Sequence, residues 1–484
     1  MTLVLCLAIV FGTVAGALLY GSRQSTQSES SMTEWAVGGR RFGSWIFWFV
    51  SAGEIYTTFA VLGISGYAWA FGAPAYIAFT SVSLACTLGY LLMPRIWAAG
   101  RQHGLVTQAD WFAVRYRAPW LGIVVALAGI VALLIYVQIQ LTALTLVFKL
   151  LLGSALAPLP AALLAAGVML AFVYVAGLRS AAFAAGVKDV LMLLLVVVLS
   201  WGVAERVGAS SMLDVYRRVQ EAHPGIGHFP GLQPEAGLGT AWLVTAALNV
   251  ALGTWIFPHM FQLSFAASSA EAIRRNAVWQ PLYSLSYFFI LLLGFGALLA
   301  GTQPADGNLN GVLLGFVAAQ YPDWVVGLLA GTVCLLALVP GSILLLTSAS
   351  LFGRNILLPL RPTLAERQVL WASRLAMVVF AGVAVWLTLT SNQSLVAIGL
   401  KAYGAIGMLA PGVFLGFYWP RTRAVGVLAG LVAGYAALLL PAANACWTQW
   451  FPGWDAALLA MAVNTLVVLL VSRFFRTDPA LDVV

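Results

Sequence analysis

Glu54 is the side chain with the clearest chemical potential, because it is a carboxylate inside an apolar stretch of the sequence. Burying a charged carboxylate in hydrocarbon costs several kcal/mol unless it is paired, hydrated or protonated. Glu54 could therefore bind a cation or carry a proton, with hydroxyl groups supplied by Thr57 and Thr58 one turn further along. The alternative is that it bonds to a neighbouring helix and serves assembly alone.

Two apolar segments contain polar and flexible residues at their centres. The first, residues 51–58, includes Glu54, and the second, residues 249–259, ends in Pro258 and His259. Within a membrane, a helix can be interrupted only where its freed backbone groups line a cavity or are buried in protein. Interruptions at corresponding places in two halves of a chain indicate an inverted-repeat carrier. Alternatively, the glycines and hydroxyl residues merely permit close helix packing.

Two charged positions allow more than one interpretation. Lys401, with Tyr403 beside it, lies inside an apolar run and could either extend to the membrane surface or attract a carboxylate. Asp189 follows Lys188 at the start of another run. It could be a helix N-terminal charge favoured by the helix dipole, or part of an inner gate or ion site.

Three neutral polar side chains are also unusual in apolar segments. Gln138 and Gln140 could line a substrate path or form hydrogen bonds across helices. His259 follows Pro258 where its segment is predicted to break. It could pair with a carboxylate or a proton, or be satisfied by freed backbone carbonyls.

The composition identifies the environment of these residues. Of 484 residues, 62% are hydrophobic and 8% are charged, and the mean hydropathy is +0.95. A soluble domain has roughly 25% charged residues, so we predict an all-α membrane protein and no enzyme activity. The net charge of +8 is not gathered on one water-soluble face, so nucleic acid is not an expected partner.

Apolar runs long enough to cross a bilayer, about 20 residues each, recur along the chain. We predict about thirteen helical spans, near residues 2–22, 43–71, 74–98, 119–152, 155–177, 183–204, 239–266, 276–302, 323–357, 369–390, 394–418, 423–441 and 455–473. With the N-terminus outside, most of the 24 lysine and arginine residues fall in cytoplasmic loops, as the positive-inside rule requires. The C-terminus is then cytoplasmic.

These spans divide the chain into five parts. They are an extra helix and loop (1–42), a first five-helix repeat (43–204), an extracellular loop (205–238), a second five-helix repeat (239–418), and two additional helices with a short tail (419–484). Within the extracellular loop we expect a short helix near residues 211–222.

Several motifs resemble the sodium:solute symporter family over residues 30–425. They include Gly38-Gly39-Arg40-Arg41-Phe42-Gly43, Gly63-Ile64-Ser65-Gly66, Thr107-Gln108-Ala109-Asp110, Lys188-Asp189 and Pro258-His259. Within the family, the runs at residues 34–43, 257–259 and 351–356 look most like bacterial monocarboxylate permeases, which import lactate, pyruvate, acetate or propionate.

The resemblance implies a leucine-transporter-like 5+5 inverted repeat with two broken helices. It also implies a sodium site formed by backbone carbonyls near Gly53 and Tyr56 and by hydroxyl groups on the ninth span. At the positions matching those hydroxyls, this sequence has Val339 and Pro340, with Ser342 nearby at a different helical angle. Hard cations need several oxygen ligands, so the departure favours proton coupling through Glu54, although both ions stay open.

We therefore predict a symporter for short monocarboxylates in the bacterial plasma membrane, without a cofactor or an obligate protein partner, and with no bound metal beyond a coupling sodium ion. The predicted substrate-binding residues are Tyr56, Thr57, Gln138, Trp255, Phe257, His259, Lys401 and Tyr403, and the predicted coupling-ion residues are Gly53, Glu54, Tyr56, Asp189 and Ser342. The alternatives are a family carrier for an amino acid, sugar, vitamin or metal ion, a transporter-like sensor subunit, or a passive channel.

Overall fold

The computed structural model describes residues 1–24, 37, 40–153 and 156–474, with only the backbone described at 20–24, 175–180 and 306. The motif residues 34–36 and 38–39 therefore lie outside the described part. All of the described secondary structure is helical except for one isolated bridge between Phe42 and Ala267.

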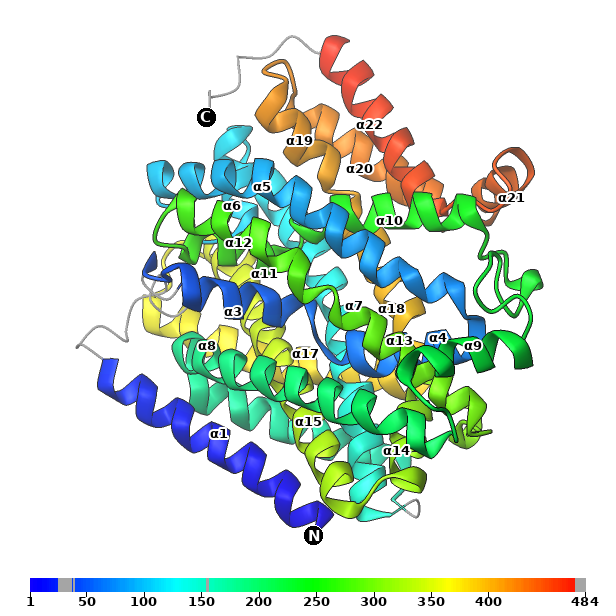
Figure 1. Cartoon of the computed structure of the whole chain (residues 1–484). Coiled ribbons are helices and arrows are strands. Elements are labelled where there is room, and N and C mark those ends of the chain that lie inside the picture. Colours follow the sequence, from blue (N-terminus) through cyan, green and yellow to red (C-terminus); the bar gives the residue numbers. More distant parts are fainter. Residues whose placement is uncertain (25–36, 38–39, 154–155, 475–484) are drawn as a thin grey trace.

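The helices follow the chain in the order expected from the apolar runs (Figure 1). The first half contains α1 (Thr2–Gln24), α3 (Ser44–Ile55), the π-helix η2 (Phe59–Gly63), α4 (Ile64–Phe71), η3 (Ala73–Tyr76), α5 (Ile77–His103), α6 (Gln108–Arg115), α7 (Pro119–Leu152), α8 (Pro158–Arg206), α9 (Met212–Ala222) and η4 (Pro234–Ala236).

The second half begins with another interrupted pair. It contains α10 (Thr240–Thr254), α11 (Pro258–Ala266), α12 (Ala270–Tyr283), α13 (Ser286–Leu299), η5 (Ala305–Gly307), η6 (Leu309–Gly311), α14 (Val312–Gln320), α15 (Asp323–Leu351), the π-helix η7 (Phe352–Leu357), α16 (Leu358–Leu360), α17 (Glu366–Thr390), α18 (Leu395–Gly407), α19 (Ala410–Tyr418), α20 (Ala424–Leu439), α21 (Pro441–Trp450) and α22 (Ala456–Phe474).

The membrane-spanning pattern is confirmed. Among the described residues, eight helices are long and apolar enough to cross a bilayer, and four bent pairs bring the number to twelve if each pair is one span. The sequence predicted about thirteen spans. The predicted span near 155–177 corresponds to the shorter apolar helix Pro158–Tyr174, which is the first part of α8. The short helix expected near residues 211–222 is present as α9.

Both predicted interruptions are confirmed as bends. The axes of α3 and the helix that follows it, Phe59–Phe71, differ by 43°, and those of α10 and α11 differ by 48°. The α10–α11 break has a local cause, because Pro258 cannot donate a backbone hydrogen bond and pushes the preceding residue out of helical geometry. Phe257 accordingly has φ −54° and ψ 133°. A third bent pair, α18–α19 at 42°, was not predicted.

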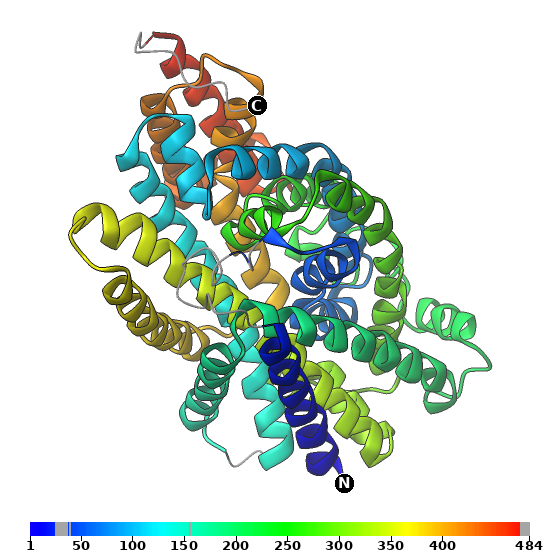
Figure 2. The same cartoon turned by 90° about the vertical axis from the view of Figure 1, so that its left-hand side faces the viewer.

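The long helix α15 forms the centre of the bundle. Its membrane window is fully buried, and α1, α7, α8 and α17 pack around it. Figure 2 shows α1, in dark blue, lying along α15 and α8. Gly327 and Gly331 of α15 face α1 closely enough that a Cβ atom at either position would lie 2.9 Å from an α1 atom. Small residues thus let these helices approach.

The two C-terminal spans form a separate close pair. Gly426, Gly430 and Gly434 recur every fourth residue of α20 and face α22. This spacing is the small-residue pattern that allows backbones of membrane helices to approach. The pair contacts α10, α18 and α19 through α22, so it packs beside the bundle that holds the breaks.

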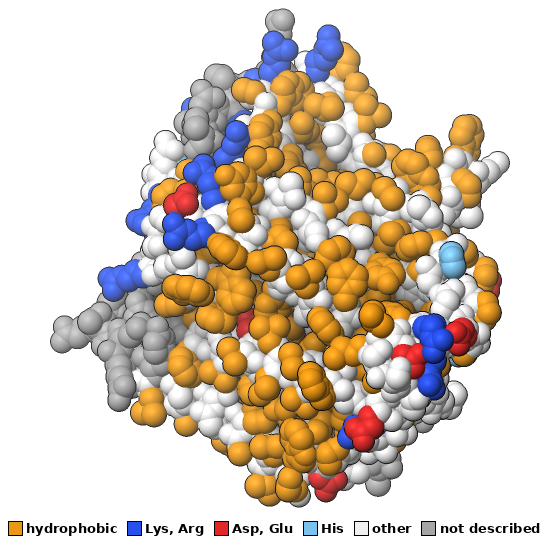
Figure 3. All heavy atoms as spheres, viewed as in Figure 1, with side chains coloured by type: hydrophobic (Ala, Val, Ile, Leu, Met, Phe, Trp, Pro, Cys, Tyr) orange, Lys and Arg blue, Asp and Glu red, His pale blue; other side chains and the backbone are white. Residues whose placement is uncertain are grey.

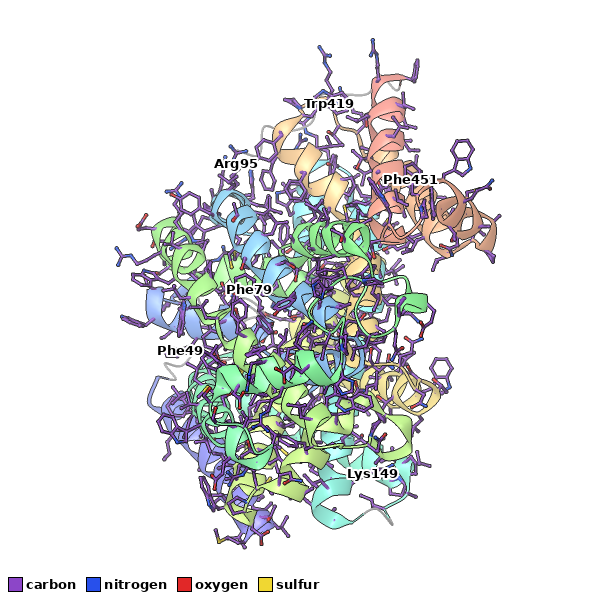
Figure 4. The ribbon with its side chains drawn as sticks, turned by 45° about the vertical axis from the view of Figure 1, so that its right-hand side comes forward. Phe49, Phe79, Arg95, Lys149, Trp419 and Phe451 are labelled. Atoms are coloured by element: carbon purple, nitrogen blue, oxygen red, sulfur yellow. The ribbon has the colours of Figure 1, made fainter. Side chains whose placement is uncertain are left out.

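The surface separates into an apolar belt and a basic end. In Figure 3, hydrophobic side chains cover the middle of the molecule, and lysine and arginine side chains gather over the ends of α3, α5 and α12. Exposed arginines in this region include Arg95, Arg101, Arg274 and Arg275. Figure 4 places Arg95 and Lys149 toward opposite ends of the molecule. An apolar belt between polar ends is the surface expected of a protein that spans a bilayer.

Candidate functional site

The first break frees backbone carbonyls at the end of α3. The last carbonyls of any α-helix have no partner within the helix. Here, the ammonium of Lys188 donates to the carbonyl oxygens of Gly53 at 2.9 Å and Tyr56 at 3.1 Å. Lys188 comes from α8, which packs against α3. A side chain of one helix therefore satisfies the broken end of another.

Lys188 is also paired with its neighbour. Its Nζ lies 2.7 Å from Asp189 Oδ1, and both side chains are fully buried. The interpretation of Asp189 as a charge at a helix start is wrong, because α8 begins at Pro158 and passes through Asp189 without interruption. A charge buried in this way persists because an opposite charge and carbonyl dipoles surround it.

A side chain of α6 forms a hydrogen bond with the backbone at the second break. Gln108 donates its amide Nε2 to the carbonyl oxygen of Ile256, in the segment between α10 and α11. On the other side of the break, Phe257 N and Ile256 N both donate to the Gly253 carbonyl oxygen. The carbonyl and amide groups at this interruption are thus bonded within the protein, as burial requires.

A group of five side chains, four of them buried and Tyr403 partly buried, lies where the two breaks meet, and we call it the central cluster. Its members are Glu54, Tyr136, Phe257, His259 and Tyr403, from α3, α7, the α10–α11 break, α11 and α18. His259 Nε2 lies 3.6 Å from Glu54 Oε2. The Tyr136 ring is stacked on His259 with centroids 6.1 Å apart, and the Phe257 ring is 5.3 Å from His259.

Aromatic rings close the cluster on its other side. The Phe257 centroid lies 5.1 Å from that of Tyr403 and 5.2 Å from that of Tyr136. One carboxylate and one imidazole therefore lie against a wall of three aromatic rings. This combination of a few polar groups with apolar walls is typical of small-molecule sites.

A small cavity adjoins Glu54 and His259. Its volume is about 10 Å³, and it lies between α3, α11 and α15, where Thr347 and Ile343 of α15 form one wall. A cavity of about 10–15 Å³ holds one water molecule. Within the described side chains, Glu54 Oε2 and His259 Nδ1 have no hydrogen-bond partner. The site is thus closed around a water-sized space with unsatisfied polar atoms.

Three predicted substrate residues have side chains directed elsewhere. The Trp255 indole donates to the Ala85 carbonyl oxygen on α5 at 2.6 Å. The Tyr56 hydroxyl is 2.7 Å from Ser284 Oγ, between α12 and α13. Thr57 accepts a hydrogen bond from the backbone of Phe59 at 3.3 Å. These side chains stabilise the breaks and their packing, whereas Phe257, His259 and Tyr403 enter the central cluster.

Three other predicted residues also lie outside the cluster. Gln138 donates to the Leu387 carbonyl oxygen on α17 at 3.1 Å, which matches its interpretation as a bond across helices. Lys401 is exposed on α18, as expected if it extends to the membrane surface. Ser342 donates to Val339 of its own helix at 2.6 Å, so its hydroxyl hydrogen is already used.

Sequence reasoning missed the roles of Lys188, Tyr136 and Gln108. A lysine beside an aspartate in an apolar run is a visible signal for a buried ion pair, but the partner helix cannot be read from it. Tyr136 lies on the same face of α7 as Gln140, whose side chain accepts a hydrogen bond from Thr58 at 2.7 Å. The sequence carries no sign that Gln108 reaches the second break.

A separate polar network joins α6 to η7. Asp110 Oδ2 accepts from Arg354 Nε at 2.7 Å, and Oδ1 accepts from Asn355 Nδ2 at 2.8 Å. The backbone amides of Val106 and Thr107 also donate to Asp110. The network therefore binds the loop before α6 to the end of the central helix through one carboxylate.

Comparison with known proteins identifies the family. A model of the sodium:solute symporter family matches residues 35–434. The chain belongs to the sodium:solute symporter family. It is accordingly a multi-pass membrane transporter and not an enzyme.

Relatives of this symporter extend over most of its length. An uncharacterised symporter of Bacillus subtilis (strain 168), YhjB, is 34% identical over 436 residues, which cover 89% of this chain and 88% of that protein. A monocarboxylate transport permease protein of Rhizobium johnstonii is 27% identical over 458 residues, covering 91% and 90% of the two chains.

The fold agrees with a solved structure of a distant protein. The substrate-bound, outward-open structure of a Na+-coupled sialic acid symporter superposes with a TM-score of 0.79 at 16% identity and covers 99% of both chains. The all-helical leucine-transporter-like architecture expected from the sequence is thereby confirmed.

The Asp110 network yields a stability prediction for the purified symporter. We expect Asp110→Ala to lower the free energy of unfolding by about 2–3 kcal/mol, because Arg354, Asn355 and two amides lose their acceptor. Denaturant unfolding in detergent measures the change. Arg217→Ala is the control. Its ion pair with Asp214 is 67% exposed on the arginine side, so its loss costs below about 1 kcal/mol. Equal effects would contradict a stabilising role for the network.

Proposed function

We propose that this symporter imports short monocarboxylates together with a coupling cation. Family membership and the likeness to a monocarboxylate permease support the substrate class. The observation that carries the proposal is the close approach of Glu54 and His259, whose Oε2 and Nε2 atoms lie 3.6 Å apart, with both side chains buried where two broken helices meet. Broken helices at the midplane are the common position of substrate and ion sites in inverted-repeat carriers.

The substrate carboxylate would bind at the start of α11. The first amides of a helix have no intrahelical acceptor and carry a positive partial charge. His259 occupies the first turn of α11 and adds a donor beside these amides. The short apolar tail of the substrate would lie against the rings of Tyr136, Phe257 and Tyr403. A monocarboxylate matches this division into one anionic end and one apolar end.

Binding also requires the site to open. The cavity of about 10 Å³ beside Glu54 holds about one water molecule, so the helices around the breaks must move apart to admit a solute. Rocking of one helix group against the other would expose the site to each side of the membrane in turn.

Glu54 would carry the coupling proton. A neutral, protonated Glu54 removes a charge from the closed site, whereas an ionised Glu54 is costly to bury without a counter-ion. Movement of the loaded carrier would therefore require protonation, and release of the proton on the inner side would reset it. The basic end of the molecule would face the cytoplasm of a bacterium, with the N-terminus outside.

Transport by the purified protein tests the substrate class. In proteoliposomes loaded with an unlabelled solute, we expect saturable counterflow of labelled lactate, pyruvate, acetate or propionate, because the proposed site fits a carboxylate with a short tail. Proline, glucose and pantothenate are the comparison solutes. Counterflow of one of these alone would contradict the monocarboxylate proposal. Unitary currents would indicate a channel, and inactivity toward every solute would favour a sensor.

Glu54→Gln tests the coupling role. We expect this variant to lose uptake driven by a pH gradient by at least about tenfold, while solute exchange persists, because the amide mimics the protonated carboxyl and cannot release a proton. Initial rates in proteoliposomes measure both modes. Glu205→Gln, which changes a carboxylate that is 85% exposed, is the control and should behave as wild type. Driven uptake equal to wild type in Glu54→Gln would make Glu54 structural.

A further inference from the structure

The Lys188 ammonium occupies a position suited to a free cation. Three oxygens surround its nitrogen, namely the carbonyls of Gly53 at 2.9 Å and Tyr56 at 3.1 Å and the carboxylate of Asp189 at 2.7 Å. A lysine ammonium has three donors and no acceptor; it donates to the two carbonyls and forms an ion pair with the Asp189 carboxylate. The Lys188 and Asp189 side chains are fully inaccessible to solvent.

The backbone at this point attracts positive charge for a general reason. Both carbonyls belong to the C-terminal end of α3, where the helix dipole is negative. Half-helix C-termini and unwound carbonyls of this kind coordinate sodium ions or protons in inverted-repeat carriers. The carboxylate of Asp189 adds a full negative charge. The same set of oxygens would thus bind a monovalent cation if no lysine were present.

Neighbouring residues favour the ammonium over a free ion. Gly53 leaves room for Lys188, since a Cβ atom at Gly53 would lie 3.1 Å from Nζ and 3.3 Å from Cε. The central helix α15 packs against both α3 and α8. On it, Val339 and Pro340 offer no side-chain oxygen. The three oxygens match the three donors of an ammonium, whereas a free metal ion in the same place would need water or further oxygens to complete its shell.

We propose that Lys188 is a tethered cation, whose ammonium fills the carbonyl site at the α3 break in place of a sodium ion. This inference rests on the proposed function only in treating the chain as a cation-coupled carrier. A sodium ion cannot enter while the ammonium is present, because the two charges would compete for the same oxygens and repel each other. Transport then has no requirement for sodium at this position.

Removal of the amine provides the test. We would measure binding of radioactive sodium to purified wild-type protein, Lys188→Ala, Lys188→Met and the control Lys149→Ala, which changes a lysine at the far end of α7. We expect Lys188→Ala and Lys188→Met to bind about one more sodium ion per chain than wild type. Sodium should also raise their unfolding temperature. Lys149→Ala should match wild type in both measurements.

The possible outcomes separate this proposal from the proposed substrate. Folded Lys188 variants that bind no more sodium than wild type would overturn it. If the variants fold only when sodium or methylammonium is present, the proposal is supported, because a free cation then replaces the tethered one. Misfolding that no cation corrects would contradict it and assign Lys188 to assembly. None of these results depends on which solute is carried, so failure of the monocarboxylate proposal would leave them unchanged.

Discussion

The structure depends on the need to satisfy backbone groups freed at two helix breaks deep in an apolar bundle. Water is not available there to bond these groups, and each unsatisfied group costs several kcal/mol. The protein meets this need with side chains from other helices. Lys188 of α8 binds the carbonyls at the first break, and Gln108 of α6 binds Ile256 at the second. At each break, a side chain from another helix therefore bonds the freed backbone carbonyls.

The same breaks explain why the central cluster can be functional. Glu54 and His259 remain incompletely bonded beside a water-sized cavity, although the nearby hydroxyls of Tyr56 and Thr58 are hydrogen-bonded. Buried polar groups are normally satisfied, and exceptions are expected where a ligand or proton must bind. Packing elsewhere is close, with glycines at the α1–α15 and α20–α22 contacts. The central cluster thus combines a carboxylate oxygen and an imidazole nitrogen that lack hydrogen-bond partners with an adjoining water-sized cavity.

The sequence predicted the parts of this arrangement that follow from local chemistry. Pro258 and the polar run at 51–58 indicated where the helices break, and the carboxylate in an apolar span indicated Glu54. The directions of side chains were harder to predict, because they depend on which helix packs alongside. Trp255 thus faces α5 rather than the cluster, and Lys188 of α8 reaches the Gly53 carbonyl oxygen of α3. Tyr136 enters the cluster through long-range packing between α7 and α11 residues, which periodicity does not encode.

The most direct measurement is an experimental structure of the protein in lipid nanodiscs with pyruvate bound. We expect density for the anion between the α3 break and the first turn of α11, in contact with His259 and the aromatic rings. We also expect the Lys188 ammonium still to donate to the carbonyls of Gly53 and Tyr56. Continuous helices through residues 51–58 and 249–259, or pyruvate bound away from both breaks, would contradict these expectations.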